Sequence, residues 1–215
     1  MRTKALLVAA VLAAGLATSM AENVYSLNVV GYHTVTVPAN GYALIANQLD
    51  SGDNTLKSVI PVAPDGAIFY KFDGGAWKGY MYDELEPGWT PNGDVTLAPG
   101  EGGMFKNNTA SPLNITFVGE VLQGEQTASL PQGYSVRSSK FPIAESLTSM
   151  ELPAADGDLV YVFSGDGYTG YMYDELEPGW TPGNLNGPTI KVGEAFFIKK
   201  VAAASWVRNF TVPQN

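Results

Sequence analysis

The sequence lacks cysteine altogether and has a single histidine, His33, among its 215 residues. Without cysteine there are no disulfide bonds, thiolate metal sites or cysteine nucleophiles. A serine–histidine–aspartate triad or a histidine-ligated metal site would have to use His33. That residue stands in an alternating apolar and polar run with no serine or acid motif around it. We therefore interpret His33 as a strand residue and predict that the protein is not an enzyme.

Basic residues are also few. The chain carries 12 Lys and Arg against 21 Asp and Glu, a formal net charge of −9. Leaving out residues 1–21, which contain Arg2 and Lys4 and no acidic residue, gives 10 basic against 21 acidic groups, or −11. Like-charge repulsion from phosphates makes a nucleic-acid partner unfavourable. The composition is compatible with neutral partners or divalent cations.

Long hydrophobic runs are absent except for Ala5–Ala17. As a helix these thirteen residues rise about 20 Å, too little for a hydrocarbon core of roughly 30 Å. Arg2 and Lys4 precede the run, and the small residues Ser19 and Ala21 follow it. This order is typical of a secretory signal peptide. We predict a signal peptide over residues 1–21, no membrane insertion after its cleavage, and a secreted, extracellular or cell-surface protein, with the periplasm as an alternative.

What the sequence does contain favours β-structure. Short runs rich in Val, Ile, Tyr, Phe and Thr are broken every eight to twelve residues by Gly, Pro, Asn and Asp, which predicts an all-β protein. Glycine-containing steps at residues 73–76 and 164–167 predict tight hairpins. Brief helical turns are expected around Asn54–Val59, with a cap at Asn54 or just before it, and around Ala144–Glu151. The clearest strands are Val29–Val37, Ala67–Phe72, Leu113–Val118, Leu159–Phe163 and Ala195–Lys199.

An internal repeat organises the chain. Residues Gly79–Pro91 (GYMYDELEPGWTP) recur letter for letter at Gly170–Pro182. The thirteen residues before each copy share only four identities: Gly66/Gly157, Tyr70/Tyr161, Phe72/Phe163 and Gly74/Gly165. Outside this region Gly41-Tyr42 corresponds to Gly133-Tyr134, and Lys106 corresponds to Lys199. Repetition at this period predicts two tandem pseudo-symmetric β-sandwich or barrel-like repeats, at residues 22–120 and 121–215.

Two segments of the first copy, Gly41–Leu49 and Leu97–Phe105, have the patterns G-aromatic-x-L-I and P-G-E-G-x-aromatic. They resemble a module of bacterial secreted and cell-surface tandem-repeat proteins. The resemblance implies a small β-sandwich or barrel-like unit, mostly of uncharacterised function, and carries no catalytic residue. The second copy departs from the pattern at residues 135–139, and residues 192–196 lack the proline.

The duplicated segment is the candidate site because it concentrates aromatic and acidic side chains. Aromatic faces can stack on sugar rings while carboxylates bind hydroxyls, which predicts a glycan contact. Clustered carboxylates could instead hold Ca²⁺. The alternatives are that the aromatics form the core and the acids a solvated strand end, or that the segment packs between repeats. The candidate residues are Tyr80, Tyr82, Asp83, Glu84, Glu86 and Trp89, with Tyr171, Tyr173, Asp174, Glu175, Glu177 and Trp180.

Within this segment Pro87 and Gly88 predict a type II turn over residues 86–89. Taken together, these features predict a secreted, non-catalytic structural or interaction protein of the cell surface or extracellular matrix. The alternatives are a carbohydrate-binding module and a calcium-stabilised β-module, with Ca²⁺ as the one candidate cofactor. The expected partners are a glycan, another surface protein or a second copy of the chain.

Overall fold

The computed structural model describes residues 29–212, and the predicted signal peptide lies outside this range. The regular secondary structure of the described chain is almost entirely β-strand, which confirms the predicted all-β class. The first half contains β1 (Val30–Val37), β2 (Tyr42–Ala46), α2 (Leu56–Val59), β3 (Ile68–Asp73), β4 (Ala76–Asp83), β5 (Gly88–Thr90), β6 (Gly102–Lys106) and β7 (Leu113–Glu120). The second half contains β8 (Gly124–Leu130), β9 (Gly133–Arg137), β10 (Glu145–Ser146), β11 (Leu159–Phe163), β12 (Tyr168–Asp174), β13 (Gly179–Thr181), β14 (Thr189–Ile190), β15 (Phe196–Lys200) and β16 (Ala204–Phe210).

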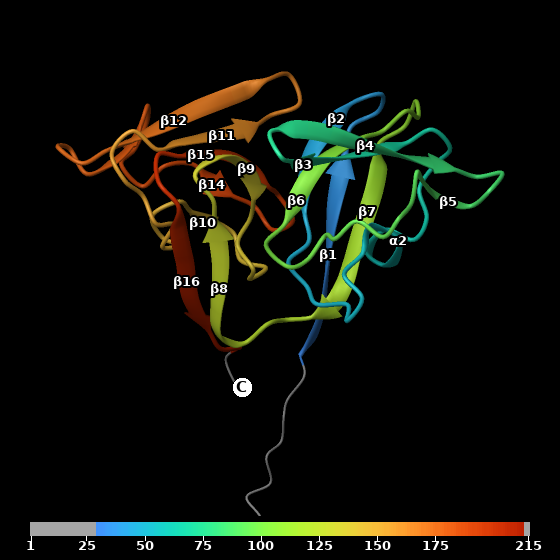
Figure 1. Cartoon of the computed structure of the whole chain (residues 1–215), viewed down its shortest axis with the longest axis horizontal. Helices are drawn as coiled ribbons and strands as arrows, with labels where there is room; N and C mark the ends of the chain where they lie inside the picture. Colours follow the sequence, from blue (N-terminus) through green and yellow to red (C-terminus); the bar gives the residue numbers. More distant parts are fainter. Residues whose placement is uncertain (1–28, 213–215) are drawn as a thin grey trace, which may run out of the picture.

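Each half contains a five-stranded antiparallel sheet and a two-stranded ladder (Figure 1). The sheet of the first half has the order β2-β6-β3-β4-β5, and that of the second half has the order β9-β15-β11-β12-β13. The ladders pair β1 with β7 and β8 with β16. A further short pair, β10 with β14, lies in the second half. In each half the first and last strands along the chain form the ladder, and the strands between them include the five of the sheet.

Tight glycine turns form the predicted hairpins. Asp73 pairs with Ala76, leaving Gly74 and Gly75 as a two-residue loop with φ of 60° and 83°. Positive φ at both loop positions matches the right-handed twist of the flanking strands, and glycine adopts it without a Cβ clash. In the second half the loop has four residues, 164–167, between the paired Phe163 and Tyr168.

Alternating side chains create one core in each half. In the first half, the inner face of the five-stranded sheet contributes Phe69 and Phe105, which pack with Ile115 and Phe117 of β7. The second core is built in the same way from Val160, Ile198 and residues of the β8–β16 ladder. Burial on one face and exposure on the other follow from the two-residue period of a strand.

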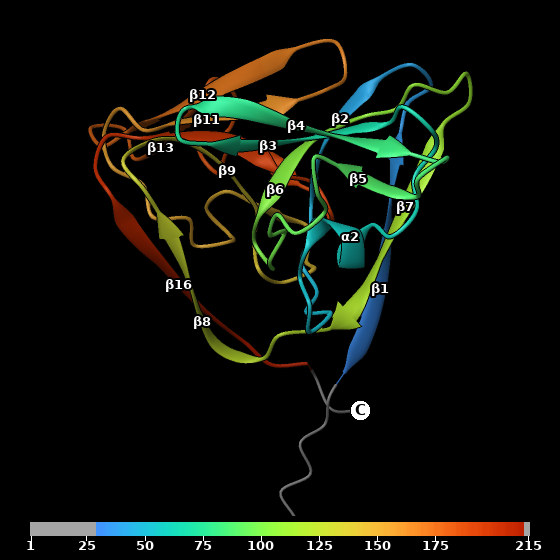
Figure 2. The same ribbon diagram turned by 45° about the vertical axis from the view of Figure 1, so that its right-hand side comes forward.

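A third core joins the halves. It contains Leu44, Ala46 and Met104 from the first half with Val136 and Ala195 from the second. Figure 2 shows the two five-stranded sheets meeting along the upper part of the molecule. The halves therefore share this third core and are not joined only by the linker between β7 and β8.

Three main-chain hydrogen bonds cross this junction, one of which joins the N–H of Ala195 to Leu44 O at 3.2 Å. The N–H of Ala46 donates to Gly193 O at 2.8 Å, and the N–H of Ser138 donates to Gly100 O at 3.0 Å. Leu44 and Ala46 lie in β2, and Ser138 directly follows β9. The junction is thus held by backbone pairing as well as by apolar contact.

Local structure differs from the sequence expectation at three places. The helix α2 starts after Thr55, whose side chain makes no capping bond, while the Asn54 amide donates to Asp50 Oδ1 at 2.7 Å. Residues 144–151 form the short strand β10 and hydrogen-bonded turns in place of a helix. The turn expected at residues 86–89 lies at residues 84–87, because Gly88 already pairs with Asp83 in β5.

The one helix among residues 29–212 falls far short of the length and apolar character that crossing a membrane requires.

Candidate functional site

The aromatic residues of the duplicated segment face the two cores. Tyr82 and Trp89 are each 4% exposed, and Trp180 is 1% exposed. The indole N–H of Trp89 donates to Ile60 O at 2.8 Å. Its ring lies edge-on to Tyr82, with centroids 5.4 Å apart. These indoles present no open face to a ligand, since each is enclosed by its own core.

The remaining tyrosines of the segment are half-buried. Tyr80 packs against the first core, and Tyr171 and Tyr173 pack against the second. Tyr173 lies edge-on to Trp180, with ring centroids 5.4 Å apart, which repeats the Tyr82–Trp89 pair. The structure thus brings these aromatics together as packing groups.

The carboxylates organise the turn that follows β4. Asp83 Oδ1 accepts the N–H of Leu85 at 2.8 Å and that of Glu86 at 3.3 Å. Glu84 exchanges hydrogen bonds with Asp65, each at 3.2 Å: the N–H of either residue donates to the carboxylate of the other. Main-chain donors therefore already engage one oxygen of each of these three carboxylates. Glu86 itself is exposed.

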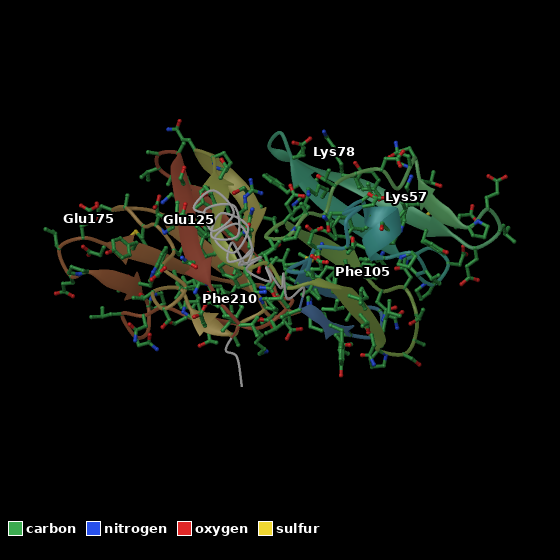
Figure 3. All side chains as sticks on the ribbon, turned by 90° about the horizontal axis from the view of Figure 1, so that it is seen from below. Lys57, Lys78, Phe105, Glu125, Glu175 and Phe210 are labelled. Carbon is green, nitrogen blue, oxygen red and sulfur yellow. The ribbon has the colours of Figure 1, made fainter. Side chains whose placement is uncertain are left out.

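The second copy reproduces this arrangement. Asp174 Oδ1 accepts the N–H groups of Leu176 and Glu177 at 2.8 and 3.4 Å. Asp156 and Glu175 exchange bonds at 3.2 and 3.3 Å. Figure 1 shows β5 and β12 toward opposite ends of the molecule, and Figure 3 shows Glu175 at the outer end of the second half. Across residues 29–212, no three His, Asp or Glu side chains lie close enough together to hold a metal ion.

His33 is buried in β1 and packs against β7. Its ring stacks on Phe117, with centroids 4.9 Å apart and planes 19° apart. Neither ring nitrogen makes a well-formed hydrogen bond. Burial lowers the pKa of His33 below its usual value of 6.5, and the nearby main chain of Ala46 offsets part of that shift. A neutral, stacked imidazole acts here as a packing group.

A groove lined by aromatic rings lies where the two sheets meet. It has a volume of about 350 Å³, which is within the range of small-ligand sites. None of its lining side chains is charged, and both halves contribute to it. Three of its aromatic rings are well exposed: Tyr42 at 37%, Trp77 at 39% and Tyr168 at 48%. The lining residues, which we call the aromatic groove, are Tyr42, Tyr70, Trp77, Met104, Phe163 and Tyr168.

Beside the groove the aromatic surface continues as a closed stack. Phe197 lies between Tyr134 and Trp77, with centroids at 5.3 and 5.9 Å and planes within 20° and 19°. Phe72 meets the edge of this stack, 4.8 Å from the Phe197 centroid. The same outer sheet faces therefore hold an open aromatic groove on one side and a filled aromatic stack on the other.

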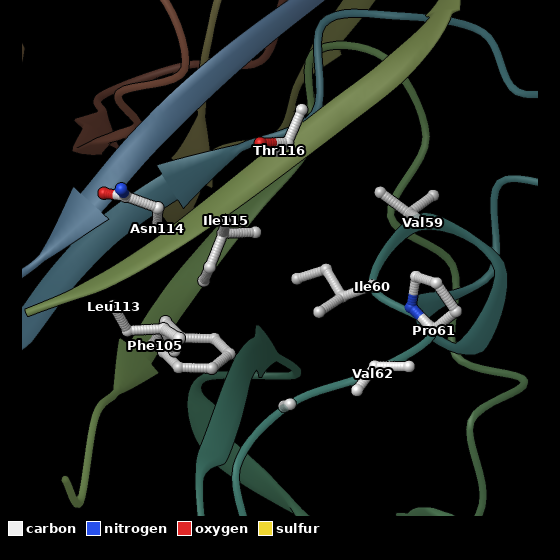
Figure 4. Close-up of a pocket in the computed structure, with 10 residues that line it drawn as sticks. Val59, Ile60, Pro61, Val62, Phe105, Leu113, Asn114, Ile115 and Thr116 are labelled. Carbon is white, nitrogen blue, oxygen red and sulfur yellow. The ribbon is translucent and has the colours of Figure 1, made fainter.

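A second cavity, of about 210 Å³, lies between the α2 region and β7 (Figure 4). Its lining is largely apolar: the side chains of Ile60, Val62 and Ile115 surround it, and Asn114 and Thr116 add polar groups from β7. Its lining contains no carboxylate, imidazole or amine side chain. The cavity therefore offers less for recognition than the aromatic groove.

The sequence interpretation centred on the duplicated segment and did not single out the aromatic groove. The signal was present in the diverged stretch, where Tyr70/Tyr161 and Phe72/Phe163 are retained between copies while neighbouring positions differ. These residues alternate along β3 and β11, which places them on the outer faces of the two sheets. No family model, curated protein or solved structure matches the chain.

Proposed function

We propose that the protein is a secreted, non-catalytic carbohydrate-binding protein of the cell surface or extracellular matrix, and that its ligand occupies the aromatic groove. The observation that carries the proposal is the set of exposed Tyr42, Trp77 and Tyr168 rings around one uncharged opening. Rings fixed on rigid strands provide flat faces on which a sugar's C–H surface can stack. A cluster of exposed aromatic rings is typical of a binding surface, because rings that serve only packing are buried.

The polar groups around the groove also suit a sugar. The hydroxyls of Tyr42, Tyr70 and Tyr168 can donate and accept hydrogen bonds from sugar hydroxyls. Lys106 lies above Tyr42, with Nζ 5.8 Å from the ring centroid, and adds a donor at the edge. The net negative charge of the chain disfavours an acidic polysaccharide. We therefore propose a neutral glycan.

We further propose that the chain consists of two pseudo-symmetric tandem units. The identical order of corresponding strands in the two five-stranded sheets supports this. The identical duplicated segment forms the same strand–turn–strand in each half, with Asp83 paired to Gly88 and Asp174 paired to Gly179. Under this proposal the segment supports each core, and the ligand binds where the two units meet.

Fluorescence provides a direct test, because Trp77 is the one exposed tryptophan of four. Trp89, Trp180 and Trp206 are at most 4% exposed. Neutral β-linked and α-linked hexasaccharides are screened separately. We expect one of them to shift the fluorescence emission of Trp77 and to protect this fluorescence from quenching by iodide. The Trp77→Ala and Tyr168→Ala variants should bind that glycan at least about tenfold more weakly.

Tyr32→Ala is the matched control, because Tyr32 is 80% exposed on β1 and does not line the groove. Unchanged binding in both groove variants would contradict this site. Binding of a proline-rich peptide and of no glycan would assign the groove to a protein partner instead, since aromatic grooves also accept extended proline-rich chains. Release of reducing sugar from a bound glycan would contradict the non-catalytic assignment.

The secretion part of the proposal has its own test. Expression of the full chain in a bacterial host should yield a processed product outside the cytoplasm. Its mass should correspond to residues 22–215, because cleavage is expected after Ala21. Retention of residues 1–21 on the exported chain would contradict this prediction.

A further inference from the structure

The aromatic surface is built from positions that correspond between the two halves. Each half supplies a tyrosine at the start of its sheet's first strand, paired across the ladder with a lysine: Tyr42 with Lys106, and Tyr134 with Lys199. Each lysine also lies over its tyrosine, with Nζ 5.8 and 5.7 Å from the ring centroids. The two ends of the surface are therefore alike.

The hairpins correspond as well. Phe72 contacts Trp77 at 5.2 Å on the β3–β4 hairpin, and Phe163 contacts Tyr168 at 5.1 Å on the β11–β12 hairpin. Each hairpin reaches the sheet of the other half: Phe72 and Trp77 meet Phe197 of β15, and Phe163 and Tyr168 share the groove with Met104 of β6. Two equivalent half-sites would result if every position were the same.

The hairpin position differs only in the kind of aromatic ring, Trp77 in one half and Tyr168 in the other, whereas a position on the neighbouring strand breaks the equivalence. Met104 is opposite Tyr70 in the strand register, and Phe197 is opposite Tyr161, so methionine and phenylalanine occupy corresponding places. In the second half the ring of Phe197 fills the space between Tyr134 and Trp77. In the first half Met104 forms the floor of an open groove.

We propose that Phe197 is a built-in occupant of one half-site, and that the open half-site takes a single pyranose ring of a neutral glycan between Tyr42 and Tyr168, above Met104. This inference rests on the proposed function and adds the position, orientation and number of bound rings. Phe197 shows that two aromatic rings of this surface can hold a flat six-membered ring between them. The corresponding rings of the open half are Tyr42 and Tyr168.

The chemistry of the two floor residues fits this assignment. Methionine is unbranched and adapts its shape, so it can lie flat beneath a ligand. Phenylalanine at the same place brings its own ring into the stack and leaves no room for another. A pyranose chair is a disc with apolar C–H faces, and it can therefore replace the phenyl ring between two aromatic faces. The chain should bind one glycan, not two.

Reciprocal exchange of the two floor residues tests the inference. The probe is the neutral hexasaccharide that the tryptophan screen selects, titrated calorimetrically into the mature chain. Wild type should bind one equivalent. Met104→Phe should weaken binding at least about tenfold by filling the groove, whereas Phe197→Met should raise the stoichiometry to two. Met172→Phe is the matched control, because Met172 is 45% exposed and lies outside the groove.

The outcomes separate this inference from the function on which it rests. If Met104→Phe binds like wild type while Trp77→Ala does not, the groove binds glycan and the half-site assignment is wrong. A stoichiometry of one in folded Phe197→Met, or of two in wild type, would also overturn the assignment. Failure of every glycan to bind wild type would overturn both. Near-ultraviolet circular dichroism of each variant confirms that its core is intact.

Discussion

At the scale of single residues, the four tryptophans differ in role because they differ in burial. Trp89 and Trp180 are enclosed by the cores, so replacing either by alanine should remove about 3–5 kcal/mol from the free energy of unfolding. Trp77→Ala should cost much less, because 39% of its side chain is already exposed. Urea unfolding of the three variants measures this difference. Equal losses for Trp77 and Trp89 would contradict the assigned roles.

His33 makes stability depend on pH in a defined direction. Burial lowers the pKa of its imidazole in the folded chain below the usual 6.5 of the unfolded chain. At pH values between the folded and the unfolded pKa, the unfolded chain therefore binds a proton that the folded chain does not. The free energy of unfolding is therefore fully retained above 6.5 and falls as the pH drops below it. We expect a lower Tm at about pH 5.5 than at about pH 7.5.

His33→Phe serves as the control for this prediction. It keeps a ring stacked on Phe117 and removes the titrating group, so most of the difference in Tm should disappear. Asp50 and Glu101 do not contribute to the difference in Tm, because a carboxyl whose pKa is lowered by folding changes stability only at pH values below this range. The pKa of Asp50 is lowered by its hydrogen bond from Asn54, and Lys71 and hydrogen bonds outweigh the effect of burial to lower that of Glu101. An unchanged pH dependence in His33→Phe would show that another group is responsible.

At the scale of elements, the turn after β4 is held by carboxylate-to-main-chain bonds. Asp83→Ala should lower the free energy of unfolding by about 0.5–2 kcal/mol, because the N–H groups of Leu85 and Glu86 lose their acceptor. Asp174→Ala should do the same in the second half. Glu86→Ala is a suitable control, since Glu86 is exposed and its carboxylate is not needed for the turn.

The same bonds bear on the calcium hypothesis. Asp83 and Glu84 already accept main-chain hydrogen bonds, so the turn forms without a cation. An ion that bound only the folded chain would raise its melting temperature. We expect the same Tm in excess chelator and in millimolar Ca²⁺. A clear rise in Tm with Ca²⁺ would support the duplicated segment as a calcium site.

Much of the element structure could be predicted because it depends on local chemistry. The strand at residues 159–163 and the glycine turn at residues 74–75 follow from alternation and from positive φ. The type II turn was placed two residues too late, because proline and glycine at 87–88 also fit the start of a strand. What decides the turn is the hydrogen bond that Asp83 Oδ1 accepts from the Leu85 N–H, together with the pairing of Asp83 with Gly88, and residue propensities predict neither.

The candidate site was harder to predict, for a different reason. The duplicated segment attracts attention because Tyr82 and Trp89 recur in identical form, yet a strand pattern does not say which face another unit will cover. Here the inner face is enclosed, which buries those rings. The outer faces meet across the junction and assemble Tyr42, Trp77 and Tyr168 from distant parts of the chain. This assembly depends on how two units pack, which local sequence does not encode.

At the scale of the whole molecule, Gln48 ties the two halves together from within. It is 1% exposed, and its Nε2 donates to Phe141 O at 3.1 Å and to Ser138 Oγ at 3.2 Å. Its Oε1 accepts the N–H of Gly193 at 2.8 Å. All three partners belong to the second half, so one side chain of the first half satisfies buried polar groups of the other.

We therefore predict that the halves unfold as one cooperative unit. Scanning calorimetry of residues 22–215 should give a single transition whose calorimetric and van't Hoff enthalpies agree. Gln48→Leu should lower Tm and reduce the free energy of unfolding by about 1–3 kcal/mol, because the buried Gly193 N–H loses the acceptor that Gln48 provides. Gln132→Leu is the control, because the Gln132 side-chain amide donates to Val201 O within the second half. Two separate transitions in wild type would mean that the shared core contributes little. The aromatic groove, which needs both halves, would then lack the fixed geometry on which glycan binding depends.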